Sequence, residues 1–89
     1  MACVELLIVN KLGLHARAAT KLVQMAMKFE SEVYLLQGET KVNGKSILGI
    51  LLLAASFGKT IQICAEGKDE QTAIAAITEL VKNKFGESS

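Results

Sequence analysis

Apolar positions recur with two different periods along this chain, and the change from one to the other predicts strands alternating with helices. Residues Cys3–Val9 are rich in aliphatic and β-branched side chains, which is typical of a strand. A loop containing Gly13 follows over Asn10–Leu14, and a helix is predicted from Ala16 to about Met27. That helix would bury one stripe of side chains at i, i+3, i+4 and i+7: Ala19, Leu22, Val23 and Ala26.

The middle of the chain predicts a hairpin and then an ambiguous apolar run. Strands are expected at Glu32–Gln37 and Thr40–Asn43, with a tight turn at Gly38-Glu39 between them. The run Ile47–Ala55 is apolar all round, so periodicity alone permits either a short helix or a buried strand. We favour a helix, because Ser46 before it is a good N-cap and the run is rich in Leu and Ala.

The last third of the chain predicts one strand and one helix. Residues Thr60–Glu66 alternate between apolar and polar side chains, which is typical of a half-buried strand. Asp69 is expected to cap a final helix. The apolar face of that helix would consist of Ala73, Ile74, Ile77, Leu80 and Val81.

The predicted order is strand, helix, strand, strand, helix, strand, helix, which belongs to the α+β class. Four short strands can bury one face against three helices, so we expect an open-faced β-sandwich with a four-stranded antiparallel sheet and all three helices on one face. The last strand can enter the sheet between the first two. A chain of 89 residues has room for one such domain, spanning residues 1–89.

Composition and charge exclude several classes of function. The net charge is +1 with the signs interspersed, and aromatic residues make up only 4% of the chain, so we expect no nucleic-acid binding. The longest uncharged stretch, Ser46–Gly58, is shorter than the roughly 20 residues that span a bilayer, so no membrane insertion is expected. Cys3 and Cys64 have no metal-ligand spacing. If both lie on strands they could be neighbours in the sheet, but we expect two reduced, half-buried thiols in a cytoplasmic protein without metal or cofactor.

The candidate chemistry lies at the start of the first predicted helix, where the chain has its only histidine, His15. A neutral imidazole offers a nucleophilic ring nitrogen at neutral pH. Backbone N–H groups and the positive end of the helix dipole lie beside it, and Arg17 adds a guanidinium. A lone histidine at a helix start is more often a surface or capping residue, but this combination is also suited to a phosphoryl group.

Two motifs favour the interpretation of His15 as a residue that receives a phosphoryl group. Residues 13–17, Gly-Leu-His-Ala-Arg, resemble the phosphorylation-site motif of the HPr family, the histidine-containing phosphocarriers of the bacterial phosphoenolpyruvate-dependent phosphotransferase system. Residues 43–50, Asn-Gly-Lys-Ser-Ile-Leu-Gly-Ile, are similar to the family's second signature, around a regulatory serine. The resemblance extends over nearly the whole chain. It implies a relay, not a stand-alone enzyme: Nδ1 of His15 accepts a phosphoryl group from enzyme I and passes it to a histidine of an IIA-type acceptor.

The resemblance also assigns roles around His15. Arg17 would donate charge-assisted hydrogen bonds to the phosphoryl oxygens, and the backbone N–H groups of Ala16, Arg17 and Ala18 would cradle them. Family members usually have proline at the position of Ala18. Alanine is a good helix former and adds an N–H donor, so the fold should tolerate it, but it does not fix φ as proline does and so changes the stiffness of the turn under His15.

Regulation and docking are expected on the first two helices. Ser46 has two compatible roles, as helix cap and as the residue that a kinase phosphorylates in some members of the family. Positions that the core does not need would form an apolar docking surface with a polar rim. We predict that this surface consists of Thr20, Lys21, Gln24, Met27, Ile47, Leu48, Leu51 and Leu52.

Alternative functions differ in how well the sequence fits them. Gly44-Lys45-Ser46 resembles the end of a phosphate-binding loop, but Glu39 stands where that motif requires glycine, and we reject it. A regulatory binding module controlled through Ser46, without phosphotransfer, is the stronger alternative. Within the family, sugar uptake and a nitrogen-regulatory branch both remain open. We expect a monomer.

Overall fold

The computed structural model covers residues 1–89 and has the predicted order of strands and helices. A short 3₁₀ turn near the C-terminus, η1, is the one element that the sequence did not predict. The elements are β1 (Ala2–Leu7), α1 (Ala16–Ala26), β2 (Glu32–Gln37), β3 (Thr40–Asn43), α2 (Ile47–Leu53), β4 (Thr60–Glu66), α3 (Glu70–Lys82) and η1 (Lys84–Gly86).

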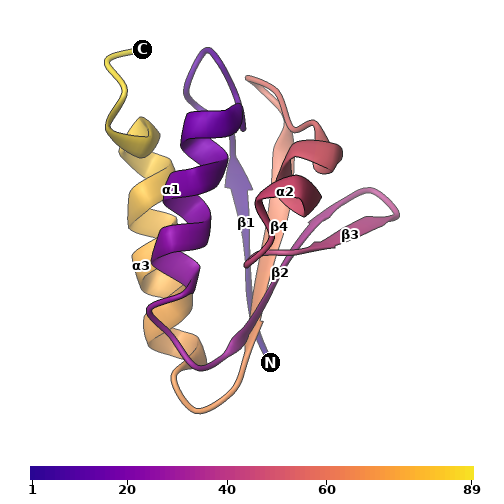
Figure 1. Cartoon of the computed structure of the whole chain (residues 1–89), viewed down its shortest axis with the longest axis vertical. Helices are drawn as coiled ribbons and strands as arrows, with labels where there is room; N and C mark the ends of the chain where they lie inside the picture. Colours follow the sequence, from indigo (N-terminus) through magenta and orange to yellow (C-terminus); the bar gives the residue numbers. More distant parts are fainter.

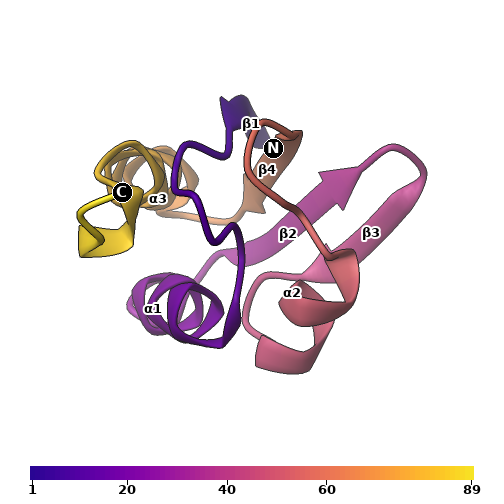
Figure 2. The same ribbon diagram turned by 90° about the horizontal axis from the view of Figure 1, so that it is seen from above.

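The four strands form one antiparallel sheet in the order β1-β4-β2-β3, so the last strand does enter between the first two. All three α-helices pack against the same face of this sheet, and the other face is left open (Figures 1 and 2). The prediction of an open-faced α+β sandwich is therefore confirmed. None of the helices has both the length and the apolar character that crossing a membrane requires.

The core lies between the sheet and the helices, and the predicted periodicities fill it. Strand β4 buries Ile61, Ile63 and Ala65, as its alternation predicted. Helix α1 buries its stripe except for Val23, which is half-buried. Phe85 of η1 is the only aromatic side chain of the buried cluster, and burying it stabilises the fold by about 2–3 kcal/mol. The C-terminal segment is therefore anchored in the core.

Two local predictions need correction. Strand β1 ends at Leu7 instead of Val9, because the chain turns into the loop before α1 after two more hydrogen bonds, from Ile8 N–H to the Lys59 carbonyl and from Gly58 N–H to the Ile8 carbonyl. Asp69 occupies the N-cap position of α3 but makes no capping bond with its side chain. Its carboxylate instead accepts hydrogen bonds from Ser31 Oγ and from the backbone N–H groups of Ser31 and Glu30, so it joins the α1–β2 loop to the start of α3.

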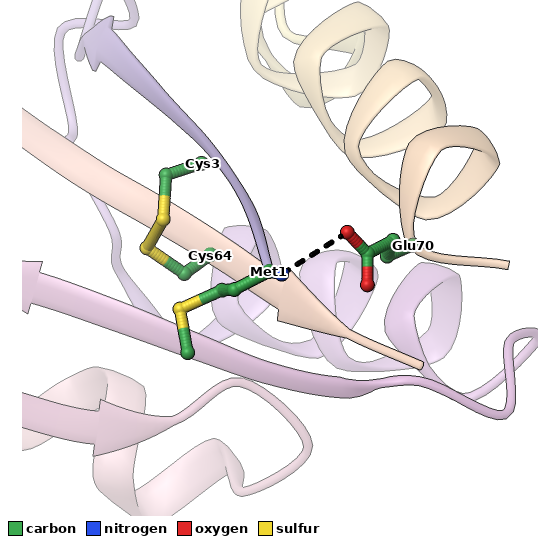
Figure 3. Close-up of a disulfide and its surroundings, with 4 residues drawn as sticks. All are labelled: Met1, Cys3, Cys64 and Glu70. Atoms are coloured by element: carbon green, nitrogen blue, oxygen red, sulfur yellow. Dashed lines mark ion pairs between the residues drawn. A yellow bond between two sulfur atoms is a disulfide. The ribbon is translucent and has the colours of Figure 1, made fainter. Parts of the chain in front are cut away.

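The expectation of two reduced thiols was wrong. Cys3 of β1 and Cys64 of β4 are directly opposite each other in the antiparallel register, and their sulfur atoms form a disulfide on the open face of the sheet (Figure 3). The N-terminal amine of Met1 lies 3.3 Å from the Glu70 carboxylate at the same end of the molecule. The alternative, that the two cysteines are neighbours in the sheet, is the one that the structure has.

Candidate functional site

His15 is the N-cap residue of α1, and its imidazole does not cap the helix. The His15 backbone is extended (φ −75°, ψ 178°), and its carbonyl accepts the first helical hydrogen bond, from Ala19 N–H at 2.8 Å. The first amides of a helix have no intrahelical acceptor, and at this helix no side chain at the N-cap position replaces one. The N–H groups of Ala16, Arg17 and Ala18 therefore form a set of donors beside the imidazole.

The loop before His15 is fixed by Gly13. Gly13 has φ +66°, and a Cβ atom there would lie 2.7 Å from the Ala55 carbonyl oxygen. Leu14 N–H donates to the same carbonyl at 2.9 Å. Because no other residue fits so close an approach at that φ, Gly13 holds the loop against the segment between α2 and β4. The position of His15 thus depends on a backbone contact that spans some forty residues of sequence.

His15 lies in a shallow pocket of about 720 Å³ between the start of α1 and the C-terminal tail. Arg17 is exposed and lines the same pocket, so its guanidinium is available to an anion there. The nine lining residues are Leu12, His15, Ala16, Arg17, Lys21, Gly86, Glu87, Ser88 and Ser89. No group of His, Cys, Asp or Glu in the structure has the number and arrangement needed to hold a metal ion.

Glu87 is the member of this pocket that sequence reasoning missed. Its Oε2 contacts Nε2 of His15, and its Oε1 accepts a hydrogen bond of 3.0 Å from Asn10 Nδ2. Burial alone would raise the pKa of Glu87, but the hydrogen bonds from Asn10 and His15 and the nearby charges of His15 and Arg17 outweigh it. The pKa of Glu87 is therefore below its usual value, and the carboxylate is charged at neutral pH.

The predicted docking residues lie on α1, at its C-cap residue Met27 and on α2, and the two helices contact each other on the helical face of the sheet (Figure 2). The most exposed of the apolar ones are Met27 at 63%, Leu48 at 68% and Leu52 at 71%. Ile47 and Leu51 are also exposed, as is Gln24, while Thr20 is half-buried and its hydroxyl donates to the Ala16 carbonyl.

One predicted residue, Lys21, and two that were not predicted modify this surface. The ammonium group of Lys21 is held in place, because its Nζ donates a hydrogen bond to the Phe85 carbonyl at 2.6 Å. This bond joins α1 to the C-terminal segment. Leu12 and Phe57 are exposed apolar residues that sequence reasoning did not include. Leu12 is in the loop before His15, and Phe57 is in the α2–β4 segment against which Gly13 packs. The exposed apolar side chains therefore extend to the loops around His15.

The capping role predicted for Ser46 is confirmed. Ser46 is the N-cap of α2, and its Oγ accepts a hydrogen bond of 3.0 Å from Gly49 N–H. The residue is half-buried, and its neighbours Ile47 and Leu48 are exposed. A charge added at Ser46 would therefore lie at the edge of an apolar surface.

A family model described as the PTS HPr component phosphorylation site matches residues 3–83. The chain belongs to the HPr family. The phosphocarrier protein HPr of Xylella fastidiosa is 51% identical over 96% of both chains. The phosphocarrier protein NPr of Shewanella violacea is 48% identical over 96% of this chain and 93% of that protein. A crystal structure of HPr from Thermoanaerobacter tengcongensis superimposes with a TM-score of 0.96 at 46% identity, with complete coverage of both chains.

Membership of the HPr family defines the class of activity. Phosphocarrier proteins of this family are relay carriers and do not act as stand-alone enzymes, and this chain is a carrier of that kind. Relatives named HPr and relatives named NPr are almost equally similar to it, so identity alone does not separate the two branches. At the departure from the usual family pattern, Ala18 is fully buried in the first turn of an unbroken α1.

Proposed function

We propose that this protein accepts a phosphoryl group from phosphorylated enzyme I on Nδ1 of His15 and transfers it to a histidine of an IIA-type acceptor. The observation that carries the proposal is the contact between Glu87 and Nε2 of His15. It occupies one ring nitrogen and leaves Nδ1 without a hydrogen-bond partner, in a pocket that Ala16 and Arg17 also line. In the transfer, the Nδ1 lone pair forms the new N–P bond, the P–N bond to the donor histidine breaks, and its electron pair returns to the donor ring.

Positioning and charge supply what the transfer needs besides the nucleophile. Arg17 donates to the phosphoryl oxygens, where a planar guanidinium suits their geometry. The amides of Ala16, Arg17 and Ala18 add the donors that the N-terminus of α1 leaves unpaired. A phosphoryl group in transfer requires little covalent help from other side chains, so a small rigid carrier is sufficient.

We assign partner docking to an apolar surface on α1 and α2, which consists of Met27, Ile47, Leu48, Leu51 and Leu52, with Thr20, Lys21 and Gln24 at its rim. An apolar surface with a polar rim is typical of transient complexes, whose partners also exist as separate proteins in solution. Where the host has a kinase for Ser46, a phosphate there would place about two negative charges beside Ile47 and Leu48 and weaken docking without unfolding α2.

The setting of the protein follows from these partners. We propose a single 89-residue domain that works as a monomer in the cytoplasm, where phosphoenolpyruvate and enzyme I are found. Disulfides are rare in that compartment, so the Cys3–Cys64 bond would respond to the redox state there. A purely regulatory role is not favoured, because the relatives to which the chain is similar are named phosphocarrier proteins.

The test is incubation with phosphoenolpyruvate and enzyme I, followed by intact-mass measurement before and after acid treatment. We expect a gain of one phosphoryl group that is lost in acid. A stable or absent modification, with the same enzyme I active on another carrier, would overturn the proposal. Addition of purified IIA proteins from the sugar and nitrogen branches would then identify the acceptor by loss of the label.

A further inference from the structure

The C-terminal tail is built to hold Glu87 against His15. Phe85 is fully buried, its carbonyl accepts a hydrogen bond from Lys21 Nζ at 2.6 Å, and Glu87 N–H donates to the Lys84 carbonyl at 2.9 Å. Lys84 and Phe85 have φ values of 58° and 56°, in the left-handed region that residues other than glycine rarely adopt. Backbone of this kind persists only where its surroundings fix it. Glu87 is therefore placed by the fold.

The side chain that receives Glu87 from the other side is Asn10. Asn10 is completely buried, and its Nδ2 donates to the Gly13 carbonyl at 2.8 Å and to Glu87 Oε1 at 3.0 Å. Its Oδ1 has no hydrogen-bond partner. A buried amide that satisfies both donor bonds and leaves its acceptor unpaired is oriented by its two acceptors. Asn10 thus joins the loop that carries His15 to the carboxylate that contacts His15.

We propose that Glu87 and Asn10 are positioning residues for phosphotransfer, an inference that rests on the function proposed above. Glu87 accepts the Nε2 proton of His15, which fixes the tautomer whose Nδ1 carries the free lone pair. As the N–P bond forms at Nδ1, positive charge develops on the ring, and the Glu87 carboxylate stabilises it while the proton stays on Nε2. Asn10 holds that carboxylate in place.

The competing interpretation is that the same contacts only tether the tail. A tether would contribute to stability and would leave the ring tautomer of His15 and the chemical step unchanged. The two roles therefore separate in measurements on His15 itself, and these can be made on the free protein without any partner.

The first experiment is NMR of the imidazole nitrogens of His15 in ¹⁵N-labelled protein at a pH where the ring is neutral. In the wild type we expect the proton to reside almost entirely on Nε2. Glu87→Ala should shift His15 toward a mixture of both tautomers, and Glu87→Gln should preserve much of the preference because the amide oxygen still accepts. Asn10→Asp, which keeps the size of the side chain but loses its donors, should act in the same direction as Glu87→Ala.

The matched control is Glu79→Gln. Glu79 is an exposed carboxylate on α3 that accepts a bond from Asn83 Nδ2 and has no contact with His15. We expect it to leave the His15 nitrogens unchanged. If Asn10→Asp does not fold, because it buries a new carboxylate, the two Glu87 variants still decide the proposal.

The second experiment is single-turnover phosphorylation by phosphorylated enzyme I. Glu87→Ala should slow the transfer about tenfold with little change in the enzyme I concentration for half-saturation, since Glu87 acts on the ring. Glu87→Gln should fall between Glu87→Ala and the wild type, because it retains the hydrogen bond and loses the charge. An unchanged tautomer together with a rate within twofold of the wild type would overturn the positioning role. Failure of the function itself would appear differently, as a wild-type protein with no acid-labile phosphate.

Discussion

Helices α1 and α2 begin in the same backbone conformation but use their N-termini in opposite ways. Both N-cap residues, His15 and Ser46, have extended φ and ψ. Ser46 closes its own helix, because its Oγ accepts from Gly49 N–H at 3.0 Å. The imidazole of His15 accepts nothing from α1 and contacts Glu87 instead, so the first amides of α1 remain available.

The difference separates stability from function. A capped helix start gains about 1 kcal/mol and has one donor fewer for a ligand, whereas an uncapped start forgoes that energy and keeps its donors. Helix α3 shows that an uncapped start is not sufficient for a site, since Asp69 at its N-cap position makes no capping bond and directs its carboxylate to Ser31. Of the three helix starts, only that of α1 adjoins a pocket containing a nucleophile and an exposed arginine.

The largest effect is expected from His15→Ala, which removes the nucleophile. Phosphorylation by enzyme I should be abolished, as measured by the gain in intact mass. The fold should be kept, because the His15 side chain makes no capping bond, but loss of its contact with Glu87 should lower the free energy of unfolding by about 1–3 kcal/mol. An acid-labile label that persists in this variant would place the chemistry elsewhere in the chain.

Arg17→Ala should slow the transfer by about 10- to 1000-fold, on the scale of losing one donor to a developing negative charge. Arg17 is exposed at the first turn of α1, so the change should have little effect on unfolding. Rapid-quench measurement of the phosphorylated fraction gives the rate, and Lys28→Ala on an exposed part of the α1–β2 loop is a suitable control. Equal rates for Arg17→Ala and the wild type would remove Arg17 from the site.

Reduction of the Cys3–Cys64 disulfide tests whether the chemistry at α1 is independent of overall stability. A cross-link that closes a loop of 61 residues should contribute roughly 2–4 kcal/mol. Cys3 is close to the N-terminus at the start of β1, and the N-terminus lies at the opposite end of the molecule from the start of α1 (Figure 1). Reduction should therefore lower the unfolding midpoint in urea and leave the transfer rate within about twofold. A large loss of rate in the reduced, folded protein would show that the two ends are coupled.

The sequence predicted the sheet and its helices because local signals agree with the final packing. In β4, strict alternation places Ile61 and Ile63 in the core, and Ser46 before an apolar run predicted α2 and its cap. The errors concern contacts between residues distant in sequence. The disulfide depends on the register that puts Cys3 opposite Cys64, and the carboxylate of Asp69 finds Ser31 only once two loops meet.

The site could be predicted only in part for the same reason. His15, Arg17 and the amides beside them are consecutive in the chain, so a motif can identify them. Glu87 and Asn10 are separated by 77 residues, and no local pattern links a polar residue after a strand to a carboxylate in the C-terminal tail. The one signal available was Phe85, an aromatic side chain near the end of a chain with few aromatics, which indicates a segment docked on the core.

Ser46→Asp tests whether the start of α2 affects docking although it does not take part in the chemistry. The added carboxylate would lie beside the exposed side chains of Ile47 and Leu48 and should weaken enzyme I binding by roughly tenfold, which corresponds to about 1.4 kcal/mol. Aspartate is itself a good N-cap, so stability should hardly change. Isothermal titration calorimetry measures the affinity, and equal values for variant and wild type would leave Ser46 with the capping role alone.

The smallest effect should come from Ser46→Ala, and it is the cleanest counterpart of His15→Ala. Removing Oγ takes away the acceptor of Gly49 N–H and should cost about 1 kcal/mol in the free energy of urea unfolding. Phosphorylation of His15 and binding of enzyme I should be unchanged, because alanine adds no charge to the docking surface. The two variants are thus expected to differ in phosphotransfer: His15→Ala abolishes it in a folded protein, whereas Ser46→Ala lowers stability and leaves it unchanged. If Ser46→Ala slowed phosphotransfer as well, the N-terminus of α2 would contribute to the site, and the separation between the two helix starts would not hold.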